Sequence, residues 1–112
     1  MNRTILKAAK EALVNLNSNR MASECMKKLS GCAGDEMAER LPHLEAQVEA
    51  TELALGGLTP RQYEILKEFY IEREDGFMER LCGMLGCCAS TVYRRKREAL
   101  RAFAMRMFGS VD

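Results

Sequence analysis

The sequence predicts an all-α protein in which a helical N-terminal extension precedes a second region of shorter helices. Apolar residues recur at the three- and four-residue spacing of a helix along most of the chain. No alternating apolar and polar run is long enough to indicate a strand. Glycines and capping residues also mark helix ends, most clearly at Gly56-Gly57 and Gly86. We place the boundary between the two regions after residue 57, so they cover 1–57 and 58–109.

Composition and charge limit the classes to which the chain can belong. It has 112 residues, of which 47% are hydrophobic, so one domain with a real core is expected. The net charge is only +1, but residues 1–34 carry six Lys/Arg against two Asp/Glu, residues 35–57 one against six, and residues 89–112 six against two. No run approaches the ~20 apolar residues of a membrane span, so we expect no membrane partner. Five irregularly spaced cysteines favour the reducing cytoplasm over a disulfide framework, although the acid-poor start also resembles a transit peptide.

Two helices are expected before the first glycines. Apolar positions from Ile5 to Leu16 form one face of a helix over 4–16. We expect the run NSN at 17–19 to break it, with Ser18 or Asn19 capping the next helix. The apolar face of that helix consists of Met21, Cys25, Met26 and Leu29, and SGCAG at 30–34 ends it.

The third helix carries a seam of apolar residues. We expect Asp35 to cap it, and Pro42 to interrupt it and start it again in a new first turn. Positions 41, 44, 48, 51, 55 and 58 then alternate spacings of three and four, as in a coiled coil. The seam fits either packing inside one chain or the pairing of two chains in a homodimer.

The second region begins with a clear helix start, LTPRQY. Thr59 is a good N-cap, Pro60 suits the first helical position, and Gln62 completes a capping box. The buried face of this helix is predicted to contain Ile65, Leu66, Phe69 and Tyr70. EREDG at 72–76 then forms a turn before a helix with the sequence FMERLCGML.

Residues 81–92 have the pattern of a helix-turn-helix. Such a unit needs a small residue where its two helices cross and a glycine four residues later in the left-handed turn. Cys82 and Gly86 meet these needs, and Leu81, Leu85, Cys87 and Val92 supply the apolar contacts. The cysteines therefore serve as small hydrophobic residues. A zinc site is the alternative, but Cys82 and Cys87 lack the second ligand pair that such a site needs, so no metal or cofactor is expected.

Residues 58–103 resemble the fourth conserved region of sigma factors in the LTPRQYEIL entry, the unit around LCGMLGCCASTV and the basic tail YRRKREALRAF. With the helical extension, the whole chain resembles small phage-encoded transcriptional regulators of the ArpU/RinA type. Cys88 departs from the family, which usually caps the recognition helix with Ser or Thr. Arg95 and Lys96 stand where relatives usually offer an aliphatic residue, and we expect their stems to lie along the core.

The resemblance implies that the helix from about Ala89 enters the major groove of double-stranded DNA. Val92, Ala99, Leu100 and Phe103 are expected to face inward. Ser90 then lies near a base edge or phosphate, Arg94 is suited to guanine, and the other basic residues to phosphates. The side chains expected to contact DNA are Ser90, Thr91, Tyr93, Arg94, Arg95, Lys96, Arg97 and Arg101. The simpler alternative is a solvated basic face on a helical bundle.

Three functions fit these observations: a sequence-specific transcriptional regulator, an interaction module that binds RNA polymerase, and an accessory protein of DNA packaging or recombination. The regulator is the expected function. An enzyme is not expected, because the chain has one histidine and shows neither a nucleophile–base motif nor a glycine-rich phosphate loop.

Overall fold

A computed structural model describes residues 4–29 and 34–110, and every regular element in these ranges is helical. The predicted all-α class is therefore confirmed. In chain order the elements are α1 (Thr4–Val14), α2 (Leu16–Lys28), α3 (Asp35–Gly56), α4 (Pro60–Leu66), the π-helical turn η1 (Lys67–Ile71), α5 (Phe77–Leu85) and α6 (Ala89–Phe108).

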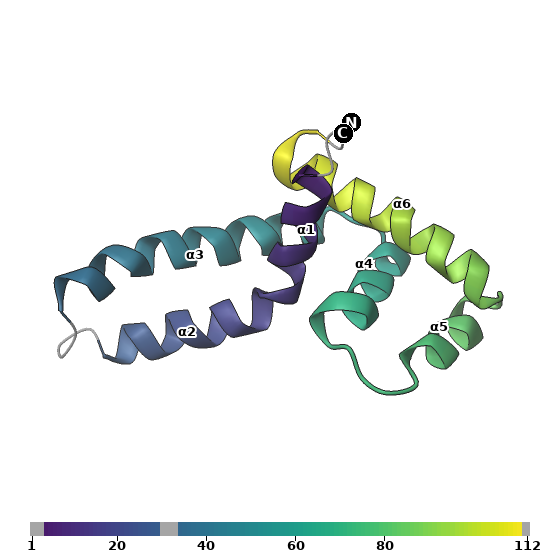
Figure 1. Cartoon of the computed structure of the whole chain (residues 1–112), viewed down its shortest axis with the longest axis horizontal. Coiled ribbons are helices and arrows are strands. Elements are labelled where there is room, and N and C mark those ends of the chain that lie inside the picture. Colours follow the sequence, from purple (N-terminus) through teal and green to yellow (C-terminus); the bar gives the residue numbers. More distant parts are fainter. Residues whose placement is uncertain (1–3, 30–33, 111–112) are drawn as a thin grey trace.

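The helices form an elongated molecule of 51 × 33 × 21 Å with an arm at one end. Figure 1 shows α2 and α3 side by side as this arm, and α4, α5 and α6 grouped at the opposite end. Helix α1 lies between the two parts and packs against α6.

Two hydrophobic clusters hold the helices together. The larger cluster combines residues of α1, α2, α3, α4 and α6, among them Leu13, Leu55 and Phe103. The smaller cluster contains Ile65, Phe69, Leu81 and Val92, and it joins α4, η1, α5 and α6. The larger cluster crosses the boundary expected after residue 57, so the two regions share one core.

The first helix break differs from the prediction. It falls at Asn15, and the NSN run at 17–19 lies inside α2. Neither Ser18 nor Asn19 caps this helix, because its N-cap position is Asn15, which makes no side-chain capping bond. The Asn17 amide instead donates a hydrogen bond to the Ile71 carbonyl oxygen at 3.1 Å. The Asn17 side chain therefore binds a residue far away in the sequence, although the local sequence pattern predicts a helix break at this position.

The prediction that Pro42 divides the third helix is also wrong. Helix α3 is continuous for 22 residues with Pro42 inside it, and Asp35 is its first residue rather than its cap. An interior proline removes one backbone hydrogen bond and costs about 3 kcal/mol. Seam residues on both sides of the proline, Leu41 and Leu44, are half-buried, and this packing favours helix continuation.

The apolar seam of α3 is used inside the chain. Thr51 and Leu55 are buried, and Val48 and Leu58 pack against the larger cluster. The seam therefore packs inside one chain, which is the first of the two predicted alternatives. The helix end that was predicted at SGCAG, residues 30–34, lies mostly outside the described residues.

The start of α4 agrees with the sequence prediction. The Gln62 backbone N–H donates to Thr59 Oγ1 at 3.2 Å, and the Thr59 N–H donates to Gln62 Oε1 at 3.1 Å, which completes the capping box. The turn at 72–76 is also present, with Gly76 at φ +79°. The π-helical turn η1, which directly follows α4, was not predicted.

Candidate nucleic-acid interface

Helices α5 and α6 meet at a tight turn that places the start of α6 at the surface. Gly86 follows α5 with φ +66°, a left-handed conformation that strains other residues. The Cys87 N–H closes the turn by donating to the Cys82 carbonyl oxygen at 3.2 Å. Val92, one turn into α6, is fully buried, and Cys82, Leu85 and Cys87 pack against its cluster. Each of these residues has the position predicted for it.

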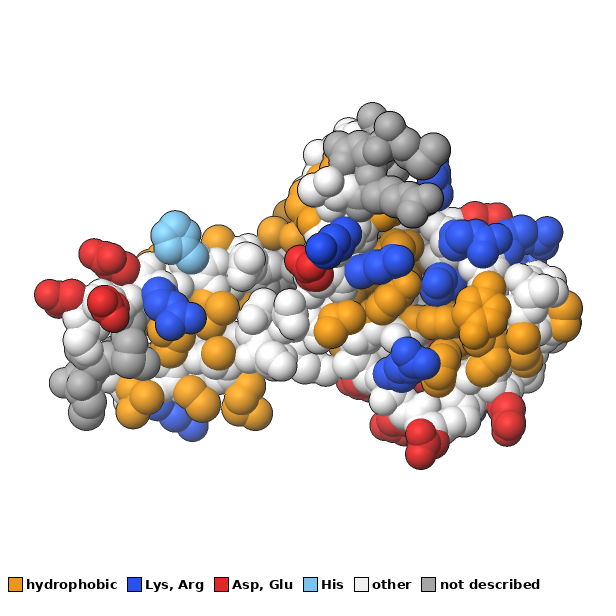
Figure 2. Space-filling model, in the orientation of Figure 1, with side chains coloured by type: hydrophobic (Ala, Val, Ile, Leu, Met, Phe, Trp, Pro, Cys, Tyr) orange, Lys and Arg blue, Asp and Glu red, His pale blue; other side chains and the backbone are white. Residues whose placement is uncertain are grey.

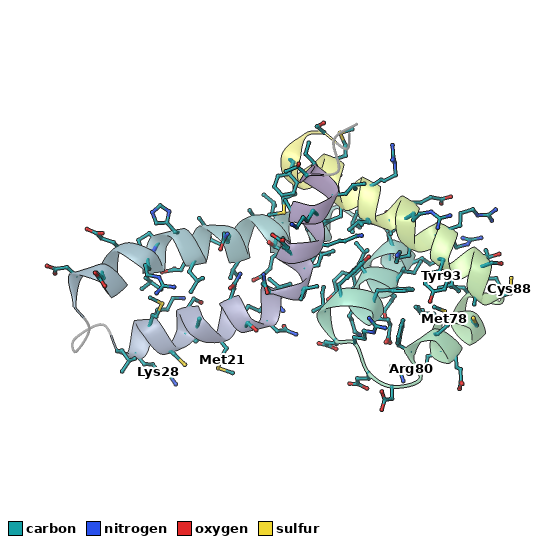
Figure 3. The ribbon with its side chains drawn as sticks, in the orientation of Figure 1. Met21, Lys28, Met78, Arg80, Cys88 and Tyr93 are labelled. Carbon is teal, nitrogen blue, oxygen red and sulfur yellow. The ribbon has the colours of Figure 1, made fainter. Side chains whose placement is uncertain are left out.

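Cys88 occupies the N-cap position of α6 without a side-chain capping bond. Its sulfur lies 3.1 Å from Ser90 Oγ and 3.6 Å from Thr91 Oγ1. The pKa of Cys88 is lowered to about 6, chiefly by its hydrogen bond with the Ser90 hydroxyl and further by the neighbouring Thr91. Figure 3 shows this thiol at the tip of the molecule, where α6 begins. The start of the predicted recognition helix therefore carries an exposed thiolate at neutral pH.

Four of the predicted contact residues line one outer face of α6. Ser90, Arg94, Arg97 and Arg101 follow one another at spacings of four, three and four residues, which places them along one side of a helix. All four are exposed, and the inward positions Val92, Ala99 and Phe103 are buried on the opposite side. We call these four residues the outer ridge.

The other four predicted residues lie off the outer ridge. Arg95 is exposed on a different flank of α6. Thr91 is half-buried beside Cys88. Tyr93 and Lys96 belong to an aromatic group around Phe69.

In this aromatic group the rings of Tyr93 and Phe69 meet edge to face, with centroids 5.8 Å apart. Lys96 Nζ lies 5.4 Å from the Phe69 centroid and 5.6 Å from the Tyr93 centroid. Burial lowers the pKa of Lys96, and the nearby charges of Lys10 and Arg97 lower it further. The expectation that the stem of Lys96 lies along the core agrees with this packing, which keeps the residue away from the outer ridge.

The basic residues of α1 were not among the contact residues predicted from the sequence. Lys10 is exposed and close enough to Lys96 to lower its pKa, and Lys7 is exposed one turn earlier. Figure 2 shows Lys and Arg side chains both over α6 and over the adjoining α1. The basic excess of residues 1–34 was visible in the sequence. Its position beside α6 depends on how α1 packs, which no local pattern shows.

The cations of the outer ridge differ from several others in the chain. Arg20 pairs with Glu52 at 3.4 Å, Lys27 with Glu45 at 3.8 Å, and Arg80 with Glu68 at 3.0 Å. Within the described ranges, Arg94, Arg97 and Arg101 form no ion pair. Their positive charge therefore remains available to an anionic partner.

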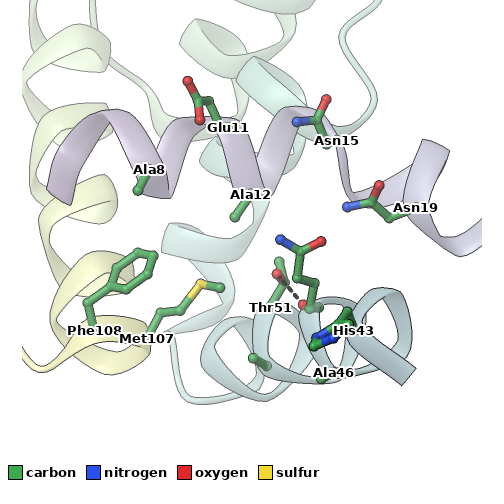
Figure 4. A pocket seen from close by; sticks show the side chains of 12 residues that line it. Ala8, Glu11, Ala12, Asn15, Asn19, His43, Ala46, Thr51, Met107 and Phe108 are labelled. Carbon is green, nitrogen blue, oxygen red and sulfur yellow. Dashed lines mark hydrogen bonds between the residues drawn. The ribbon is translucent and has the colours of Figure 1, made fainter. Parts of the chain in front are cut away.

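A second surface feature is an open cleft of about 690 Å³ between α1, α3 and the end of α6. Figure 4 shows alanines from α1 and α3 on its walls, with Met107 and Phe108 at one end. The Thr51 hydroxyl inside it donates to the Gln47 carbonyl oxygen at 2.8 Å. His43 and Glu11 come from different helices, and no hydrogen bond joins them in the described structure.

Two features that would indicate a ligand or a membrane are missing from the described residues. No three His, Cys, Asp or Glu side chains there are grouped so that they could hold a metal ion. None of the helices in 4–29 and 34–110 has the length and apolar character needed to traverse a bilayer. No family profile, curated protein or solved structure matches the chain.

Proposed function

We propose that this protein is a sequence-specific regulator of transcription, of phage or prophage type, that reads the major groove of double-stranded DNA with α6. The observation that carries the proposal is the outer ridge. Its three arginines make no ion pair with the described residues, and they share the exposed face of a 20-residue helix behind the Gly86 turn. A helix of about 10–12 Å diameter fits the roughly 12 Å wide major groove. The resemblance to sigma region 4 and to ArpU/RinA-type regulators supports the same function, with the cytoplasm as its location.

The proposed roles follow from position along the ridge. Ser90 and Arg94 lie nearest the start of α6, the part of a recognition helix that contacts base edges. Arg94 has the two-pronged donor pattern that suits guanine. Arg97 and Arg101 lie further along the ridge and suit phosphates, as does Arg95 on the neighbouring flank. Lys96 and Tyr93 support α6 through their packing on Phe69, and Lys10 extends the basic surface onto α1.

A salt series with fluorescent duplexes tests the proposal. The preferred site is first selected from random duplexes, and binding is then followed by anisotropy. With about four phosphate contacts, the log–log slope of affinity against salt should be near −3.6. Arg97→Ala or Arg101→Ala should weaken binding to all duplexes and flatten the slope by roughly one unit each. Arg40→Ala, an exposed change on the arm helix α3, removes the same charge and should leave the slope unchanged.

Arg94→Ala separates base reading from phosphate binding. It should lose about 1–3 kcal/mol on the selected site and much less on scrambled duplexes. Wild-type protein that binds no duplex at low salt would contradict the DNA-reading proposal.

The second candidate is an interaction module for RNA polymerase. It is favoured by the acidic arm helix α3, where Glu36, Glu39 and Glu49 are exposed and make no ion pair in the described structure. Retention of polymerase by a protein that does not bind duplex DNA would support it.

A further inference from the structure

Helix α1 carries two exposed lysines beside the helix proposed to read DNA. Lys7 and Lys10 are three residues apart, so they lie on one side of α1. The buried side of α1, with Ala9 and Leu13, packs into the larger cluster together with Phe103, and this packing fixes α1 relative to α6. Figure 2 shows Lys and Arg side chains that continue from α1 onto α6 across one face of the molecule. We call Lys7 and Lys10 the flank lysines.

The flank lysines belong to a group of like charges that spans two helices. Burial lowers the pKa of Lys96, and Lys10 and Arg97 lower it further because their positive charges are close. Lys96 is held in place by packing, with its Nζ 5.4 Å from the centroid of the Phe69 ring. In the part of the chain that the structure describes, Lys7, Lys10 and Arg97 make no ion pair. The positive charge of this group is therefore uncompensated on α1 as well as on the outer ridge.

The acidic residues nearest in sequence do not neutralise this group. Glu11 lines the open cleft on another side of α1, together with Ala8 and Ala12. Glu98 is exposed on α6, and it makes no ion pair with any described residue. An anion that binds beside α1 and α6 therefore reduces the repulsion within the group.

We propose that the flank lysines bind the phosphate backbone of DNA next to the segment that α6 reads. The inference rests on the proposed function, because it adds a contact to the same duplex. It differs from the outer ridge in the helix that makes the contact and in the part of the duplex that is contacted. The flank lysines bind phosphodiester groups and read no bases, because an ammonium group is a point charge without the paired donors of an arginine.

The length of α6 supports a position beside the segment that is read. Its 20 residues extend over about 30 Å at roughly 1.5 Å per residue, whereas the major groove is about 12 Å wide and curves around the duplex. When the start of a straight helix of this length lies in the groove, its later turns leave the groove and lie over a phosphate strand. Leu100 and Phe103 of these later turns share the larger cluster with Ala9 and Leu13 of α1. Helix α1 therefore lies beside the part of α6 that is next to the backbone.

An extended polyanion fits this surface better than a small phosphate compound. A small ligand is normally enclosed by a concave pocket whose polar groups converge on it. The flank lysines are instead exposed on the outer surface of α1, and the nearby Lys96 is packed against aromatic rings. Together with Arg97 they form a continuous basic surface, which suits several phosphates of one strand.

Two duplexes that share the selected site test the inference. One ends at the site, and the other adds about 10 base pairs, one turn of DNA, on each side. Wild-type protein should bind the longer duplex more tightly, with a log–log salt slope about 1.8 units steeper, because each phosphate contact contributes about 0.9. The double variant Lys7→Ala with Lys10→Ala should remove this difference and leave binding to the shorter duplex unchanged. From about 50 to about 200 mM salt, this variant should lose roughly twelvefold less affinity for the longer duplex than wild type does.

The matched control replaces two cations of the arm, Lys28→Ala with Arg40→Ala. Both residues are exposed, one on α2 and one on α3, so the control removes the same charge at the opposite end of the molecule. It should keep the wild-type difference between the two duplexes. Because all four replaced side chains are exposed, circular dichroism should show wild-type helix content for both double variants.

The possible failures of the inference are distinguishable from failure of the proposed function. A wild type that binds both duplexes with the same slope would overturn the inference and leave DNA reading by α6 intact. A variant of the flank lysines that weakens binding to both duplexes equally would also overturn it, since the lysines would then contact the site itself. If that variant matches wild type on DNA but loses binding to polyglutamate, the flank lysines face an acidic protein and the inference is wrong. A wild type that binds neither duplex contradicts the proposed function.

Discussion

Two glycines three residues apart in the α5–α6 unit should respond in opposite ways to the same substitution. Gly86 has φ +66°, whereas Gly83 lies inside α5 with ordinary helical geometry. A Cβ atom added at either position would meet no atom within 4 Å apart from its chain neighbours and, in α5, the backbone of the helix itself. Any difference between Gly86→Ala and Gly83→Ala therefore reports backbone conformation alone.

The expected magnitudes follow from this geometry. A residue with a Cβ in the left-handed region costs about 1–2 kcal/mol, so Gly86→Ala should lower the free energy of unfolding by that amount. Alanine in a helix interior is favoured over glycine by about 0.5–1 kcal/mol, so Gly83→Ala should raise it. The two variants should thus differ by roughly 1.5–3 kcal/mol.

Urea unfolding followed by circular dichroism measures both values. With a slope of about 1–3 kcal/mol per molar urea for both variants, the change appears as a shift of the midpoint. Gly86→Asn is a useful third variant, because asparagine tolerates the left-handed region better than alanine. If Gly86→Ala and Gly83→Ala shifted the midpoint in the same direction, the left-handed turn would not be a property of the folded protein.

Three other predictions concern the cap of α4, the thiol of α6 and the shared core. Thr59→Ala should lower the free energy of unfolding by about 1 kcal/mol in the same urea assay, because it removes half of a capping box. Cys88, with its pKa lowered to about 6, is mostly thiolate at pH 7 and should react with iodoacetamide faster than the exposed Cys25; its rate should fall as pH drops below about 6 and the thiol is protonated. A mass-spectrometric time course that shows equal rates at pH 7 would contradict this. Leu13→Ala should cost about 2–5 kcal/mol in urea unfolding, and the fragment 58–112 should show little cooperative unfolding, since α1, α2 and α3 supply half of the larger cluster.

Features set by neighbouring residues were predicted correctly. The capping box at Thr59 requires only residues three apart, and the Gly86 turn requires only a glycine between two helices. The inward positions of α6 follow from a single helical period, and Val92, Ala99, Leu100 and Phe103 are all buried. In each case the residues that determine the feature lie within one or two helical turns of one another, so the feature can be predicted from the sequence.

Features set by contacts between distant segments were not predictable. The Asn17 side chain bonds to the Ile71 carbonyl oxygen, 54 residues away, where the sequence suggests a helix break. Pro42 is a strong local breaker, yet α3 continues through it while packed on α2. In the candidate site, Lys96 and Arg95 are neighbours in one basic run. Lys96 packs against the Phe69 ring, which comes from η1, whereas Arg95 is exposed.

The length of α6 connects the proposed DNA surface to the rest of the molecule. Its first turns carry Val92 into the smaller cluster, and its later turns carry Leu100 and Phe103 into the larger cluster with α1 and α3. Because one helix belongs to both clusters, the direction of the outer ridge is fixed by contacts at both ends. A motif held only by α4 and α5 would lack the contacts that α1 and α3 make with the later turns of α6. The packing of α1 and α3 on the second half of α6 therefore extends the rigid part of the ridge to Arg101. It also sets how the arm is oriented relative to the residues proposed to read DNA.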